Sequence, residues 1–178
     1  MRFWKHFRCW IKSNDDSHQL PAVNFQFWLG YELRTENSGL VFKMGLKRRT
    51  RELALQMLFQ MDMGTVQLKD LEENFLPLAS APEAAKVMAL RMVRKTWDKL
   101  ADIDKHLRNL AENWDLTRMA AVDRNILRLA TYEIIYDSEI PKSVAINEAI
   151  EIVKRYSTDE SSKFVNGILD KLEKQTQS

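Results

Sequence analysis

Four basic side chains stand close together directly before an apolar helical pattern, at Lys47, Arg48, Arg49 and Arg51. Apolar residues recur at helical spacing over residues 53–58, so this basic cluster lies in the first turns of a helix. Cations there oppose the helix dipole, at a cost of roughly 0.3–1 kcal/mol each. A bound anion reverses the effect, because free backbone N–H groups and guanidinium groups suit phosphate. The spacing predicts that the basic cluster binds a polyanion and contributes little to holding the fold.

The positive charge is local rather than global. The net charge of the 178 residues is +2, whereas residues 44–60 hold four basic side chains and a single acidic one. A local positive field on a nearly neutral body is typical of a nucleic-acid-binding surface. A short basic run is also often merely solvated, and that alternative stays open at this point.

Helical periodicity continues through most of the chain after residue 44. The composition, with 45% apolar residues, 5 glycines and 4 prolines, also favours a helix-rich globular protein. We predict helices over residues 47–62, 68–76, 82–110 (one helix or two in series), 117–134, 144–156 and 157–172.

Three details of these helices are also predicted. Asp115 or Thr117 is the expected N-cap of the fourth helix. Ser157 and Glu160 have the spacing of a capping box at the start of the last helix. Gly167, inside that helix, costs up to about 1 kcal/mol against alanine, which close approach of another helix would explain.

The sequence offers little that could do covalent chemistry. No glycine-rich phosphate loop is present, and the single cysteine, Cys9, excludes a disulfide framework. His106 has Lys105 and Arg108 as near neighbours, which favours a solvated histidine over a metal ligand. Glu148 and Glu151, at helical spacing, are most simply two residues of a solvated face. We expect no enzyme activity, no cofactor and no metal.

Residues 1–43 differ from the rest, because aromatic residues crowd there without a helical or strand period. We interpret this stretch as an atypical extension outside the native domain, with Met44 as the natural start. A genuine helical or membrane-touching appendage is the alternative, and the intact mass of the native protein distinguishes the two. No window is apolar enough for a membrane span and no secretory signal is evident, so we expect a cytoplasmic protein.

Four segments, in order, resemble the NusB family of bacterial transcription antitermination factors. The first is the basic helix start, Lys47-Arg48-Arg49-Thr50-Arg51-Glu52-Leu53-Ala54-Leu55-Gln56-Met57-Leu58-Phe59. The other three are residues 122–133 (VDRNILRLATYE), residues 140–151 (IPKSVAINEAIE) and residues 163–170 (KFVNGILD). The match spans about residues 44–174, and the order of four motifs makes it specific.

The resemblance implies an all-α, NusB-like fold of two small packed helical bundles, with subdomains over about 44–114 and 115–178. It implies binding of single-stranded boxA RNA together with NusE, a small ribosomal-subunit protein, within an RNA polymerase antitermination complex at ribosomal RNA operons. Family members are monomers or dimers, so a homodimer is also possible. Carried over by position, the RNA-binding residues are Lys47, Arg48, Arg49, Arg51, Phe59, Lys163 and Phe164. Asp123 and its helix would face NusE.

Two other functions remain as alternatives. The same helical domain resembles the N-terminal module of ribosomal RNA cytosine methyltransferases. That function requires a further domain with a cofactor-binding glycine loop and a catalytic cysteine, which these 178 residues do not contain. The second alternative is a helical protein-interaction scaffold in which the arginines of the basic cluster are incidental.

Overall fold

The computed structural model describes residues 45–64, 66–111 and 115–176. Every regular element in this part of the chain is helical and none is a strand, so the predicted all-α fold is confirmed. The chain divides into two compact units, Met1–Val41 and Phe42–Ser178, and all described residues belong to the second. The interpretation of residues 1–43, and of Met44 as the start, lies outside the described residues and stays a prediction.

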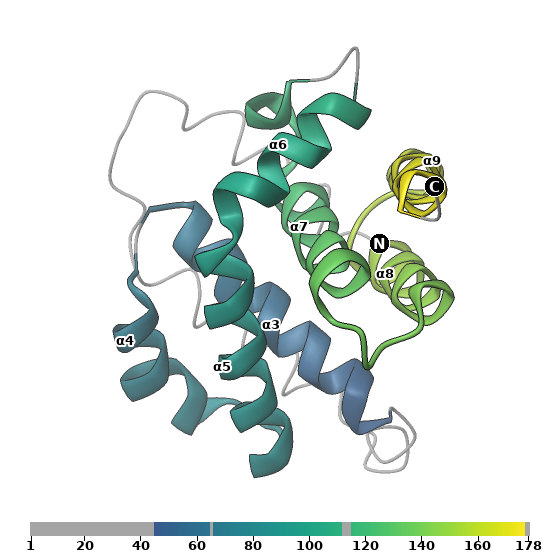
Figure 1. Ribbon diagram of the computed structural model, residues 1–178. Coiled ribbons are helices and arrows are strands. Elements are labelled where there is room, and N and C mark those ends of the chain that lie inside the picture. Colours follow the sequence, from purple (N-terminus) through teal and green to yellow (C-terminus); the bar gives the residue numbers. More distant parts are fainter. Residues whose placement is uncertain (1–44, 65, 112–114, 177–178) are drawn as a thin grey trace. The chain divides into compact units, whose positions relative to one another are not determined.

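Six helices of more than two turns make up the described fold (Figure 1). They are α3 (Leu46–Asp62), α5 (Glu83–Asp98), α6 (Leu100–Leu110), α7 (Ala121–Tyr136), α8 (Lys142–Tyr156) and α9 (Asp159–Gln175). Shorter helical pieces connect them: α4 (Leu68–Asp70), a π-helical turn (Leu71–Phe75) and two 3-10 turns (Leu76–Leu78 and Leu116–Arg118). The predicted single helix over residues 68–76 is therefore three short pieces, and Pro77 lies in the last of them.

Helix α7 is the centre of the arrangement. It packs against α3, α8 and α9, and α3 also packs against α5. In Figure 1, α7 lies between α3 and α8. One hydrophobic core joins α6, α7, α8 and α9 and includes Leu55 of α3. In the described part of the chain, no helix combines the length and apolar character that crossing a bilayer requires.

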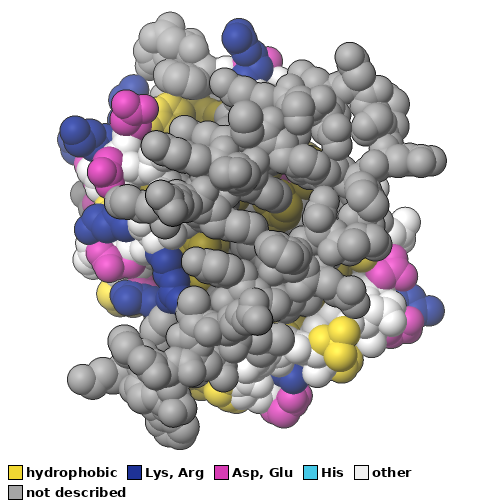
Figure 2. Space-filling view, turned by 180° about the vertical axis from the view of Figure 1, so that it is seen from behind, with side chains coloured by type: hydrophobic (Ala, Val, Ile, Leu, Met, Phe, Trp, Pro, Cys, Tyr) yellow, Lys and Arg dark blue, Asp and Glu magenta, His cyan; other side chains and the backbone are white. Residues whose placement is uncertain are grey.

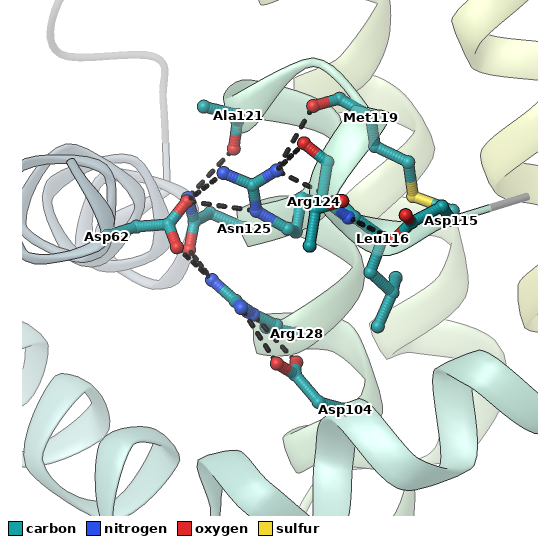
Figure 3. Close-up of polar contacts among 10 residues, drawn as sticks. Asp62, Asp104, Asp115, Leu116, Met119, Ala121, Arg124, Asn125 and Arg128 are labelled. Carbon is teal, nitrogen blue, oxygen red and sulfur yellow. Dashed lines mark hydrogen bonds and ion pairs between the residues drawn. The ribbon is translucent and has the colours of Figure 1, made fainter.

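A cluster of ion pairs fixes the end of α3 to α6 and α7 (Figure 3). The Asp62 carboxylate accepts hydrogen bonds from Arg124, Asn125 and Arg128. Arg128 also donates two hydrogen bonds of 2.8 Å to Asp104 on α6. Burial raises the pKa of Asp62, but the hydrogen bonds from Arg128 and Arg124 outweigh it, and the net direction is down. These charges hold three helices together, since each is paired with groups from another element.

The helix caps differ in detail from the predictions. Asp115 does cap a helical element, but that element is the 3-10 turn, where its side chain accepts from the Thr117 N–H at 2.9 Å. Helix α7 begins later, at Ala121, without a side-chain cap. At the start of α9, Thr158 is the N-cap and accepts from the Ser161 N–H. The predicted capping box at Ser157 is therefore one residue out of register.

The explanation predicted for Gly167 is wrong. A Cβ atom placed on Gly167 would meet nothing within 4 Å, and the residue is exposed on the outer face of α9. No helix in the described part of the chain approaches it closely. Gly64 is different, because its φ of +71° lies in the left-handed region that favours glycine. Gly64 adopts this conformation just after the end of α3.

Candidate nucleic-acid interface

The start of α3 leaves its first backbone N–H groups without a side-chain cap. Gly45 precedes the helix, and the first turn contains no acidic residue. Lys47 is exposed in this turn, and its ammonium forms no ion pair within the described residues. An uncapped helix start beside an exposed cation suits an anion, because the dipole and the N–H groups act in the same direction.

Arg48 forms a two-pronged ion pair with Glu148 of α8. Its Nε and Nη2 atoms donate to the two carboxylate oxygens at 3.0 and 2.9 Å. The side chains are 35% and 22% exposed, so solvent and ligands can reach the pair. The hydrogen bond from Arg48 lowers the pKa of the Glu148 carboxyl and outweighs the opposing effect of burial. Arg48 therefore lies at the surface, but the Glu148 carboxylate neutralises its positive charge.

Arg49 is held by two contacts within the fold. It donates to the carbonyl oxygen of Ser80 at 2.7 Å and to the Glu52 carboxylate at 3.3 Å. Glu52 is buried, and its other oxygen accepts from Arg155 of α8 at 3.0 Å. Glu52 thereby places a half-exposed arginine from α8 near the start of α3. Sequence reasoning missed Arg155, because the Glu52–Arg155 pair joins residues about a hundred positions apart.

Arg51 lies inside the protein, contrary to its predicted place on the RNA surface. Its side chain is 3% exposed and pairs at 2.9 Å with Glu133 of α7, which is 1% exposed. Burial raises the pKa of Glu133, and the Arg51 guanidinium opposes this rise without cancelling it. An arginine in this position cannot reach RNA without abandoning a buried carboxylate. The expectation that the basic cluster contributes little to the fold is therefore wrong for Arg51.

The aromatic and C-terminal candidates lie on separate helices. Phe59 is half-buried near the end of α3. On α9, Lys163 is exposed, and Phe164 packs partly buried against the core. These positions leave an exposed ammonium at Lys163 and partial ring surfaces at Phe59 and Phe164. Their contact with RNA stays a prediction.

Asp123 lies in the first turn of α7 but does not face solvent. It is 6% exposed, and its Oδ2 accepts from the Ser161 hydroxyl at 2.7 Å. Its Oδ1 has no hydrogen-bond partner among the described residues. The carboxylate links the start of α7 to the start of α9. Contact of Asp123 and its helix with a partner protein stays a prediction.

Most arginines of α3, α7 and α8 in the described part of the chain are paired with acidic side chains. Figure 2 shows Lys and Arg side chains next to Asp and Glu along one edge of the molecule.

The described residues contain no group of three or more His, Cys, Asp or Glu side chains that could hold a metal ion. A small cavity between α3, α7 and α8 has mostly apolar lining residues, apart from Arg51 and Glu133. The uncapped start of α3 is the feature of the described residues that suits an anion.

Comparison with known proteins identifies relatives for most of the chain. The transcription antitermination protein NusB of Desulfitobacterium hafniense (strain DSM 10664 / DCB-2) is 48% identical over 129 residues, which make up 71% of this chain and 86% of that protein. The protein of the same name from Trichlorobacter lovleyi (strain ATCC BAA-1151 / DSM 17278 / SZ) is 45% identical over 130 residues, covering 73% and 92%. These names describe transcription factors, in agreement with the expectation of a non-enzymatic protein.

Solved structures share the fold. A structure described as T. maritima NusB superposes with a TM-score of 0.64 at 42% identity and covers 72% of this chain and 90% of its own. A crystal structure of antitermination factors NusB and NusE in complex with dsRNA has a TM-score of 0.62 and covers 74% and 98%. At 23% identity, this second structure shows the fold alone. The model of the NusB family matches residues 48–174, and the chain therefore belongs to the NusB family.

Proposed function

We propose that this protein is an RNA-binding transcription antitermination factor that binds boxA RNA together with NusE. In this role it joins an RNA polymerase antitermination complex in the cytoplasm and promotes transcription of ribosomal RNA operons. The observation that carries the proposal is the uncapped, cation-rich start of α3 in a member of the NusB family. A solved relative was crystallised with NusE and dsRNA, which supports the same classes of partner.

The RNA-binding surface that we propose differs from the sequence prediction at two positions. Arg51 is removed, because it is buried with Glu133. Arg155 is added, because Glu52 fixes it near the start of α3. The proposed cations are then Lys47, Arg48, Arg49 and Arg155, with Lys163, Phe164 and Phe59 as adjoining candidates. Single-stranded RNA is bound by such a combination of cations on the backbone and flat groups that stack on bases.

Few cations contribute to this surface, and this supports joint binding with a partner. Four phosphate contacts give a log–log salt slope of about −3 at −0.7 per contact. Carboxylates already compensate three of the four cations. A surface of this kind gains affinity when a second protein extends it. A homodimer that buried the same face would block RNA, so we expect RNA to shift any dimer toward monomer in sedimentation velocity.

Fluorescence anisotropy tests the proposed function. A labelled single-stranded boxA RNA and a scrambled RNA of the same composition are titrated with the protein, with and without NusE. We expect tighter binding to boxA than to the scrambled RNA and a further gain when NusE is present. Equal affinity for both RNAs, with no effect of NusE, would instead favour the helical scaffold.

A further inference from the structure

Glu148 holds Arg48 in the way that a phosphate would. Both carboxylate oxygens accept from one edge of the guanidinium, at 3.0 and 2.9 Å. Arginine binds phosphate oxygens with the same two-pronged geometry. The carboxylate belongs to α8, a hundred residues away in sequence. Sequence analysis suggested that Glu148 belongs to a solvated face. In the structure it instead occupies the guanidinium of Arg48, one of the cations of the proposed RNA-binding surface.

The exposure of the pair decides whether a ligand can displace Glu148. Arg48 and Glu148 are 35% and 22% exposed, and ion pairs this open to solvent are weak. The neighbouring Arg51–Glu133 pair is closed to solvent on both sides. Arg48 can therefore exchange its carboxylate for a phosphate, whereas Arg51 cannot.

Water can solvate the Glu148 carboxylate after it is displaced from Arg48. Glu148 lies on the partly exposed face of α8, and Glu151, one turn further on, is 47% exposed and pairs with Lys154. Once released from Arg48, the Glu148 carboxylate can be solvated without an unpaired charge being left in the core. The exchange then needs only a side-chain movement at the surface.

We propose that Glu148 occupies the phosphate position on Arg48 in the free protein, and that an RNA phosphate displaces it on binding. This inference rests on the proposed RNA-binding function and adds a residue that sets its affinity. Glu148 competes with every polyanion for Arg48, so weakly held nucleic acid is released more readily. Binding becomes strong only when other contacts, from the RNA bases or from a second protein, add to it.

The Glu148→Gln variant tests the exchange, because glutamine keeps the shape and removes the charge. The probe is the labelled boxA RNA, titrated by anisotropy at several salt concentrations. Freeing one cation should add about −0.7 to the log–log salt slope and tighten binding about fivefold to tenfold at low salt. Glu151→Gln is the matched control, since it removes a negative charge from the same helix without releasing Arg48. We expect a smaller gain from the control.

Weaker binding by Glu148→Gln, or a gain no larger than that of Glu151→Gln, would overturn the inference. In that case Glu148 would position Arg48 rather than compete for it. A thermal melt of each variant shows whether lost folding accounts for any weakening. The Arg48→Gln variant adds a second check, because without Arg48 the Glu148→Gln change should gain no more than its control.

The same variants separate failure of the inference from failure of the proposed function. If Arg48→Gln weakens boxA binding but Glu148→Gln does not strengthen it, the inference fails and the RNA-binding function stands. If Arg48→Gln leaves the affinity unchanged, Arg48 does not belong to the RNA surface, and the inference fails with it. If the wild-type protein does not bind RNA with or without NusE, both fail.

Discussion

Arg51 of α3 and Glu133 of α7 form an ion pair in which the two side chains are only 3% and 1% exposed. Within one short basic segment, the structure thus separates an arginine that holds helices together from two that lie nearer the surface. Helical position explains the difference. Residues 51, 55 and 58 share one face of α3, and Leu55 and Leu58 are buried. Arg51 points in the same direction as the core.

Removing one partner of this pair should strongly destabilise the protein. Arg51→Met leaves the Glu133 carboxylate buried and uncompensated, and we expect a loss of about 3–5 kcal/mol in the free energy of unfolding. Urea denaturation measures it. The double variant Arg51→Met, Glu133→Leu should recover most of the loss, because no buried charge remains. A single variant as stable as wild type would show that the pair does not hold α3 to α7.

The Asp62 cluster should make stability depend on pH on the acid side. The pKa of Asp62 is below its ordinary value in the folded protein, so its contribution is present above the ordinary value and is lost as pH falls through the folded value. Asp62→Asn should cost about 3 kcal/mol near neutral pH. The difference from wild type should stay constant above about pH 5 and shrink as the pH falls below that value. A difference that stays constant over this range would contradict the assignment.

The open surroundings of Gly167 predict a stabilising substitution. Gly167→Ala adds a Cβ that meets nothing and removes the entropic penalty of glycine in a helix, so we expect a gain of about 0.5–1 kcal/mol. Gly64→Ala is the matched control: it also meets nothing, but its φ of +71° strains alanine, and we expect a loss of about 1 kcal/mol. Thermal unfolding of both variants separates the steric effect of the added Cβ from the strain that a positive φ causes in alanine. A loss of stability in Gly167→Ala would contradict this prediction.

Arg155 should contribute to RNA binding although the sequence did not single it out. Arg155→Gln removes a cation that is half-exposed beside the start of α3, and we expect boxA affinity to fall about threefold to fivefold at low salt. Lys154→Gln is the control on the same turn of α8, where the cation pairs with Glu151 instead. Anisotropy titration compares the two variants. Equal effects would mean that general charge, rather than the position set by Glu52, governs binding.

Much of the fold could be predicted from sequence because helical periodicity is a local signal. The boundaries of α3 and α8 were placed within two residues, and the stripe over 82–110 does form two helices in series. The cap of α9 was misplaced, because Ser157, Thr158 and Asp159 are all residues that cap helices well. Only the local backbone conformation selects Thr158 among them.

The candidate site was harder to predict, because its charges are paired over long sequence separations. Arg48 with Glu148, Arg51 with Glu133 and Arg155 with Glu52 are each more than eighty residues apart. A local count of basic residues therefore overstates the free charge at the start of α3. A signal for Arg51 was present all the same: Glu133 continues the apolar stripe of Ile126, Leu129 and Ala130, and a charge within such a stripe implies a buried partner.

The salt dependence of RNA binding tests the central claim most directly. The variant carrying Lys47→Gln, Arg48→Gln and Arg49→Gln is compared with wild type, and with Arg94→Gln on α5 as a control for an exposed arginine elsewhere. If the start of α3 binds the RNA backbone, the log–log slope for boxA RNA should become shallower by about 1–2 in the triple variant and stay unchanged in the control. A folded triple variant with the wild-type slope would contradict the account.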